Sequence, residues 1–265
     1  MENSMENIEQ LIDNLHLEDL RNELHPSVFD ENEDYDMLIV RLPVILEVLD
    51  AKSIGFVLTK QNSYIYNKDT KIFEELIGKF EGPYKIIDKL TDRVLKSFVQ
   101  YQDNIADMEE LLYKNNIKED FMNKWLSLKL DILRIERILL RTAGVIDDFM
   151  EHNKDIPEFP INHYVDIHEH LERTMRSATL QLSKLDYLYS FYNAKSNEKM
   201  NRMLYILTII SAIFLPLNLV VGFFGMNTSS LPFTQAPSGT YYAISIMMTL
   251  LIITSLTLYK WHKKI

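Results

Sequence analysis

The stretch VVGFFGMNTSSLPF, residues Val220 to Phe233, interrupts a long apolar part of the sequence. Before it lies a 17-residue run without charge, Met203 to Leu219, and after it the chain becomes apolar again. All residues from Met203 through Tyr259 are uncharged. Because a core helix of a soluble protein seldom extends so far without charge, the pattern predicts two membrane spans separated by a Gly-Met-Asn tripeptide.

The predicted spans cover residues 203–224 and 241–259, close to the ~20 residues that cross a bilayer. Lys and Arg residues precede the first span, and a basic tail, 260–265, follows the second, whereas the connector 225–240 has none. By the positive-inside rule both termini are cytoplasmic and the connector faces outward. The opening residues, MENSMENIEQ, lack the basic flank and apolar core of a signal peptide. We therefore expect a multi-pass protein of the cell (inner) membrane.

The part of the chain before the spans is strongly acidic. The first 202 residues hold all 38 Asp and Glu but only 25 of the 28 Lys and Arg. Such a surface disfavours nucleic acid and attracts cations, although a merely solvated acidic surface would look the same. The chain has no cysteine, which excludes disulfides and thiolate metal sites. It also lacks a Gly-rich phosphate loop and a nucleophile–base pair, so we expect no enzyme.

Four regions are predicted, giving a mostly α fold with a small α/β N-terminal part. Residues 1–82 contain a helix at about Asn7 to Leu20, followed by short β-branched and aromatic runs that predict two to four strands covered by helices. Residues 83–160 predict two long amphipathic helices in succession. Residues 161–202 form a stalk helix, and residues 203–265 the membrane domain.

The stalk carries the seven-residue spacing of a coiled-coil seam. No Gly or Pro occurs between Ile161 and Pro216, so one helix can run from about Asn162 into the first span, a rod on the order of 90 Å. The predicted seam consists of Leu171, Met175, Ala178, Leu182, Leu185, Tyr189 and Tyr192.

Two spans cannot enclose a pore, so several copies would have to surround one. At ~100° per residue, one side of the first predicted span presents a polar stripe whose residues fall within an arc of roughly 100° around the helix axis. An Asn in mid-bilayer is costly unless it faces water or a partner, which makes Asn218 a candidate functional residue. Alternatively, the Ser, Thr and Asn side chains only join packed helices. The stripe consists of Asn201, Thr208, Ser211, Leu215, Asn218 and Gly222.

The segment NRMLYILTIISAIFLPLNLVVGFFGMN, with a short outer loop, a second span and a basic C-terminus, resembles the CorA-type magnesium transporters. The likeness covers about Pro83 to Ile265, while the first 80 residues match only in character and look shorter than the family's N-terminal domain. The resemblance implies a homopentameric funnel in which the long helix lines the pore and the Gly-Met-Asn loops form its outer mouth.

The resemblance also implies roles for single residues. Gly225 permits a tight turn, Met226 packs, and Asn227 presents amide oxygens to the entering ion. Neutral oxygens suit Mg²⁺, which sheds water reluctantly and must be released again. The alternative is that the tripeptide is only a turn between spans. The family's pore positions fall on Asn201 at the cytoplasmic entrance, Leu207 and Leu215 as hydrophobic constrictions, and Asn218 and Gly222 above them.

A regulatory site is expected on the stalk. Asp166, Glu169 and His170 lie at positions i, i+3 and i+4 of one helical face, while His163 and His168 are expected to be solvated. In the family an acid matching Asp166 senses divalent ions between neighbouring cytoplasmic domains, and bound Mg²⁺ holds the pore shut. Its partner would be an acid of the N-terminal domain. Asp166 as an ordinary surface acid is the alternative.

The sequence therefore predicts a passive channel for divalent cations, with Mg²⁺ both transported and regulatory, and with the lipid bilayer as its surroundings. No acid follows the tripeptide in TSSLPFTQAPSG, where the family commonly has one, so the metal stays open. Transport of Zn²⁺, Co²⁺ or Ni²⁺, with or without proton coupling, is the first alternative. A membrane-anchored helical scaffold that conducts nothing is the second.

Overall fold

The computed structural model describes residues 8–114, 120–226 and 238–262. The chain divides into two compact units, Met1–Ser190 and Phe191–Ile265. One helix, α5 (Ile161–Phe224), belongs to both units. The predicted asparagine of the pore mouth, Asn227, lies outside the described residues.

The first unit contains a five-stranded antiparallel sheet in the order β1-β2-β3-β4-β5. The expectation of two to four strands was wrong by one. The β-branched and aromatic runs from which strands were predicted, DMLIVRLPVI, SIGFVLTK and SYIYN, correspond to β2, β3 and β4. The strands β1 and β5 were missed because each is a short edge strand that contains acidic residues. The strands are β1 (Val28–Glu31), β2 (Asp36–Ile45), β3 (Leu49–Leu58), β4 (Ser63–Asn67) and β5 (Ile72–Leu76).

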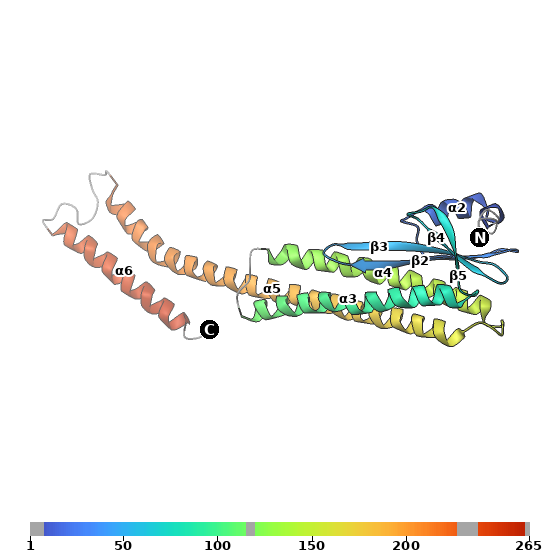
Figure 1. Ribbon diagram of the computed structural model, residues 1–265. Helices are drawn as coiled ribbons and strands as arrows, with labels where there is room; N and C mark the ends of the chain where they lie inside the picture. Colours follow the sequence, from blue (N-terminus) through green and yellow to red (C-terminus); the bar gives the residue numbers. More distant parts are fainter. Residues whose placement is uncertain (1–7, 115–119, 227–237, 263–265) are drawn as a thin grey trace. The chain divides into compact units, whose positions relative to one another are not determined.

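Helices cover both faces of this sheet, as predicted (Figure 1). On one face lie residues 8–11, which are helical, and α2 (Asn14–Arg21). The single N-terminal helix that the sequence predicted is therefore wrong: Asp13 breaks it and caps α2 by accepting a hydrogen bond from the Leu15 amide at 2.8 Å. A Cβ at Gly55 of β3 would lie 2.3 Å from Leu20 Cδ2, so the glycine allows α2 to approach the sheet.

The other face packs against α3 (Glu81–Tyr113) and α4 (Phe121–Asn153), which confirms the predicted pair of long helices (Figure 1). An aromatic cluster joins these layers to α5. Phe149 of α4 lies at the centre, with its ring centroid 5.3 Å from Phe29, 5.1 Å from Tyr164 and 5.8 Å from Phe159. The Tyr164 hydroxyl donates to the Phe80 carbonyl at 2.9 Å, so this buried polar group is satisfied.

The seam of α5 differs in part from the predicted one. Leu171, Ala178 and Leu185 are buried as expected, but Tyr189 is 38% exposed and Thr174 and Gln181 are buried instead of their apolar neighbours. A prediction based on hydrophobicity could not identify these two polar residues as buried. Thr174 satisfies its hydroxyl locally by donating to the His170 carbonyl at 2.9 Å. The buried residues of α5 are Tyr164, Ile167, Leu171, Thr174, Ala178, Gln181, Leu185 and Leu188.

The continuity of α5 confirms the long helix inferred from the sequence. Its 64 residues pass through Pro216 without a break and correspond to a length on the order of 95 Å. Within the described residues, α5, through its C-terminal part, and α6 (Gly239–His262) are the two helices that are long and apolar enough to cross a membrane. The predicted spans therefore both fall on helices.

Candidate pore and metal-binding sites

The predicted stripe lies on the exposed side of the C-terminal part of α5. Leu207 and Leu215 are 59% and 68% exposed, and Asn218 and Gly222 are exposed as well. Asn201 and Thr208 are also exposed, and only Ser211 is partly shielded. The Thr208 hydroxyl donates to the Leu204 carbonyl at 2.8 Å, which lowers the cost of its burial in lipid. The described part of the chain thus leaves this stripe exposed.

A different face of the same helix is partly shielded. At ~100° per residue this face is centred more than 120° around the helix from the stripe. The side-chain hydroxyl and amide groups of the stripe therefore lie on the side that the described residues leave exposed, where water or a partner molecule could contact them. The shielded residues include Tyr205, Ile209, Ile213, Pro216 and Val220.

Gly225 ends α5 with a close backbone contact. Its amide donates to the Val221 carbonyl at 2.8 Å, and a Cβ added here would lie 2.9 Å from that carbonyl oxygen. Any larger residue would have to shift the backbone, which supports the tight turn expected of this position. Met226 is 49% exposed in the single chain, and the packing expected of it stays a prediction.

Two of the three residues predicted to be regulatory, Asp166 and His170, belong to a cluster of three carboxylates and one imidazole. His170 of α5 lies between two acids, with Nδ1 3.6 Å from Asp92 Oδ1 and Nε2 3.8 Å from Asp166 Oδ1. Ligand atoms of Asp88, Asp92 and His170 all lie within 4.8 Å of one another. Among the described residues the buried Nδ1 of His170 has no hydrogen-bond partner, so this nitrogen could serve as a ligand atom for a cation.

The structure supplies two residues that the sequence reasoning missed. Asp88 and Asp92 come from α3, not from the stalk, and lie at i and i+4 on one face of that helix. That spacing was visible in the sequence, but only the packing of α3 against α5 pairs it with His170. Glu169 is exposed and lies outside the cluster within the described residues.

Two other stalk histidines are not simply solvated. His168 Nε2 lies 3.1 Å from Asp147 Oδ2 of α4, so the expectation for His168 was wrong. His163 is exposed as expected, but its ring stacks on Tyr84 at a centroid distance of 4.5 Å. Both contacts hold the start of α5 against the helix pair.

Repulsion within the cluster affects protonation. Burial raises the pKa of Asp88, and the charges of Asp92 and Asp166 raise it further, while His170 and His163 act in the opposite direction. Carboxylates that repel one another at close range favour either a proton or a metal ion. An oxygen-rich set with one imidazole can hold Mg²⁺ and also Co²⁺ or Zn²⁺.

This pKa shift predicts a pH dependence for the metal-free protein. The raised pKa means that the folded state binds a proton at Asp88 more tightly than the unfolded state does. The free energy of unfolding should therefore fall as pH rises from the ordinary carboxyl pKa through the raised pKa of Asp88. In EDTA, Asp88→Asn should therefore raise the melting temperature relative to wild type more at pH 7.5 than at pH 5. Thermal unfolding at the two pH values measures this difference.

The exposed Asp103 of α3 provides the matched control, because it has the same charge on the same helix. Asp103→Asn should change the melting temperature equally at both pH values. A pH-independent effect of Asp88→Asn would contradict the proposed repulsion.

The comparisons with known proteins agree with the architecture. The family model described as CorA-like Mg2+ transporter protein matches residues 1–260. The chain belongs to this family. Members of the CorA-like family are ion transporters or channels, not enzymes.

Individual CorA-like relatives are distant in sequence. The Bacillus subtilis protein YfjQ is 26% identical over 64% of this chain and 53% of its own length. The zinc transport protein ZntB of Vibrio parahaemolyticus is 19% identical over 66% of this chain and 56% of its own length. The chain thus spans about half the length of these curated relatives.

The fold is also found in an archaeal member. The cobalt/magnesium transport protein CorA of Methanocaldococcus jannaschii is 23% identical over 84% of this chain. A solved structure of the CorA magnesium transporter from that organism matches with a TM-score of 0.77 at 18% identity, covering 94% of this chain and 83% of that one. At that identity the match establishes the fold.

Proposed function

We propose that the chain is the subunit of a homopentameric channel through which a divalent cation, Mg²⁺ in the first place, crosses the membrane passively. The observation that carries the proposal is α5. It is one helix that contributes Asp166 and His170 to the carboxylate–imidazole cluster near its start and carries an exposed polar stripe near its end, next to Gly-Met-Asn. Membership of the CorA-like family supports the same reading.

Copies of α5 would surround the pore with their stripes. Leu207 and Leu215 would form hydrophobic constrictions, Asn201 the cytoplasmic entrance, and Asn218 with Gly222 the part above the constrictions. Asn227 would offer uncharged amide oxygens at the outer mouth, which bind a hydrated ion without trapping it. The membrane potential supplies roughly 4.6 kcal/mol per 100 mV to a doubly charged ion, so the channel needs no nucleotide.

The exposed stripe gives a direct test of the pore lining. Because the chain has no cysteine, single cysteines report cleanly. Asn218→Cys should conduct and then lose most of its flux after reaction with a cationic methanethiosulfonate. Flux into proteoliposomes measures the loss.

Val220→Cys is the control at the same depth, since two residues turn the helix by about 200° and move it only ~3 Å along the axis. Its flux should be insensitive to the reagent. Equal inhibition of both variants, or of neither, would contradict a pore lined by the stripe.

We also propose that Mg²⁺ at the cluster regulates the channel. When the ion is bound, Asp88, Asp92, Asp166 and His170 would no longer repel one another, and the cytoplasmic parts of neighbouring copies would be held in a closed arrangement with both termini in the cytoplasm. Loss of internal Mg²⁺ would restore the repulsion and open the pore. The charge count of the cluster, three acids to one imidazole, supports this proposal.

Removing one ligand should shift the regulation without abolishing transport. In Asp166→Asn we expect half-inhibition to require about tenfold more internal Mg²⁺, as is typical when a metal site is impaired. The measurement is flux as a function of internal Mg²⁺. Asp103→Asn should keep the wild-type concentration, and an unchanged curve for Asp166→Asn would leave Asp166 as an ordinary surface acid.

Zn²⁺, Co²⁺ and Ni²⁺ are the alternative transported ions. The similarity to the zinc transport protein ZntB of Vibrio parahaemolyticus is the observation that supports them. Flux of each ion in the same vesicles decides between them. A scaffold that conducts nothing would pass none of the four ions.

A further inference from the structure

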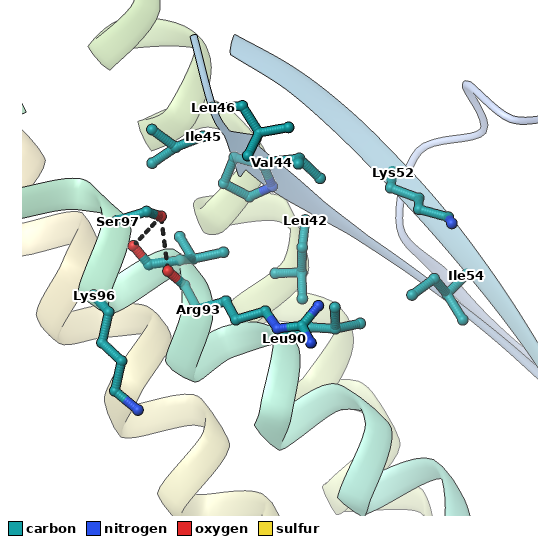
Figure 2. Close-up of a pocket in the computed structure, with 12 residues that line it drawn as sticks. Leu42, Val44, Ile45, Leu46, Lys52, Ile54, Leu90, Arg93, Lys96 and Ser97 are labelled. Carbon is teal, nitrogen blue, oxygen red and sulfur yellow. Dashed lines mark hydrogen bonds between the residues drawn. The ribbon is translucent and has the colours of Figure 1, made fainter. Parts of the chain in front are cut away.

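A second candidate site lies in the first unit, between α3 and the sheet, and none of the four residues of the metal cluster lines it. A cavity of about 490 Å³ separates the end of the β2–β3 hairpin from α3 (Figure 2). This volume falls within the range typical of small-molecule sites. It is lined by Leu42, Pro43, Val44, Ile45, Leu46, Lys52, Ile54, Leu90, Arg93, Val94, Lys96 and Ser97.

The interior of the cavity is apolar. Leu42 of β2 and Val94 of α3 are each 3% exposed and form part of its wall, together with Ile54 and Leu90 from the facing elements. The hydroxyl of Ser97 donates to the carbonyls of Arg93 and Val94 at 2.7 and 3.2 Å and is thus occupied by its own helix (Figure 2). An aliphatic group can therefore enter without leaving a wall polar group unpaired.

The charged residues of the lining are all cationic. Lys52 comes from β3 and Arg93 from α3, and no acid lines the cavity. Lys96 pairs with Asp92 at 2.9 Å, but Arg93 and Lys52 make no ion pair within the described part of the chain. Figure 2 shows the Arg93 side chain extending from α3 toward the strands. Two unpaired cations over an apolar cavity are unusual in a chain of net charge −10.

We propose that this cavity binds an amphipathic anion, an aliphatic chain that ends in a carboxylate. The chain would lie against the wall formed by Leu42, Leu90 and Val94. The carboxylate would accept hydrogen bonds from the planar guanidinium of Arg93, with the ammonium of Lys52 nearby. Charge complementarity selects this class, because an aliphatic amine or alcohol carries no negative charge to pair with Arg93 or Lys52. The inference is independent of ion transport.

Photolabelling of the full chain in lipid nanodiscs tests the proposal. A decanoic acid carrying a diazirine should label residues 42–54 and 90–97, and free decanoate should compete whereas decylamine should not. Because a charged hydrogen bond contributes about 1.5–3 kcal/mol, Arg93→Gln should reduce the labelling about tenfold or more. Arg137→Gln, an equal change at an exposed position of α4 outside the cavity, should leave it unchanged. Label confined to the membrane spans, or equal label in both variants, would overturn the proposal.

A single cysteine distinguishes the ligand from another occupant. Leu46 lines the cavity and is 70% exposed, so Leu46→Cys should react readily with a maleimide. Decanoate should slow this reaction at least severalfold, and Arg93→Gln should remove the protection. If the cysteine of Leu46→Cys is already unreactive without decanoate and cross-links to another copy, a second copy of the chain covers the cavity and the proposal is wrong.

Discussion

Asn227→Ala is expected to reduce divalent-cation entry by more than about a hundredfold. In a pentamer one substitution removes five amide oxygens from the outer mouth at once. If each contributes a net ~1 kcal/mol to holding the ion, the loss amounts to about 5 kcal/mol, which exceeds two orders of magnitude in occupancy. Initial rates of Mg²⁺ entry into proteoliposomes, measured at equal protein density, give the ratio.

The control for this variant lies on α5 before the predicted membrane span. Asn197 of α5 is exposed, so Asn197→Ala should conduct like wild type. Size-exclusion chromatography of Asn227→Ala should show an unchanged oligomer, which separates a lost ion site from lost assembly. Wild-type entry in Asn227→Ala would reduce the tripeptide to a turn between spans, a role that the close contact of Gly225 with Val221 already supports.

Phe149→Ala should be the most destabilising single change in the first unit, at about 3–5 kcal/mol. Phe149 is fully buried, and its ring meets aromatic rings from β1, from the segment before α5 and from α5 itself. Truncation would leave a cavity where three elements join, and surrounding rings cannot collapse into it freely. Denaturant unfolding of the full chain, followed by tryptophan fluorescence, measures the change.

Leu140→Ala tests whether the effect comes from burial. Leu140 lies on the same helix and is 60% exposed, so its truncation should cost less than about 0.5 kcal/mol. The loss of stability in Phe149→Leu should lie between those of Phe149→Ala and Leu140→Ala, since leucine keeps most of the side-chain volume. Similar losses for Phe149→Ala and Leu140→Ala would contradict the central place given to the aromatic cluster.

The long helix and the two spans could be predicted because their signals are local. Continuity of α5 follows from the absence of Gly and Pro between Ile161 and Pro216, and the spans follow from a charge-free run. The register of the stalk seam could be predicted only at its apolar positions. Thr174 and Gln181 are buried by the seven-residue spacing despite their polarity, so hydrophobicity placed the neighbouring Met175 and Leu182 there instead.

The candidate metal cluster shows the limit of local reasoning. Asp166 and His170 could be paired from their i, i+4 spacing, and so could Asp88 and Asp92, but nothing in the sequence joins the two pairs. They meet because α3 and α5 pack in one unit, an interaction between residues nearly 80 positions apart. The two edge strands were missed for a related reason, since their pairing with β2 and β4, rather than their composition, defines them.

The most direct test of the whole account is divalent-cation entry into proteoliposomes that contain only the purified chain. With an inside-negative potential and low internal Mg²⁺, we predict rapid entry of Mg²⁺ that slows as internal Mg²⁺ rises. Selective entry of Zn²⁺, Co²⁺ or Ni²⁺ would support a channel whose transported ion is not Mg²⁺. If none of these ions enters at any internal Mg²⁺ concentration, the chain shares only the architecture of the CorA-like family and does not conduct.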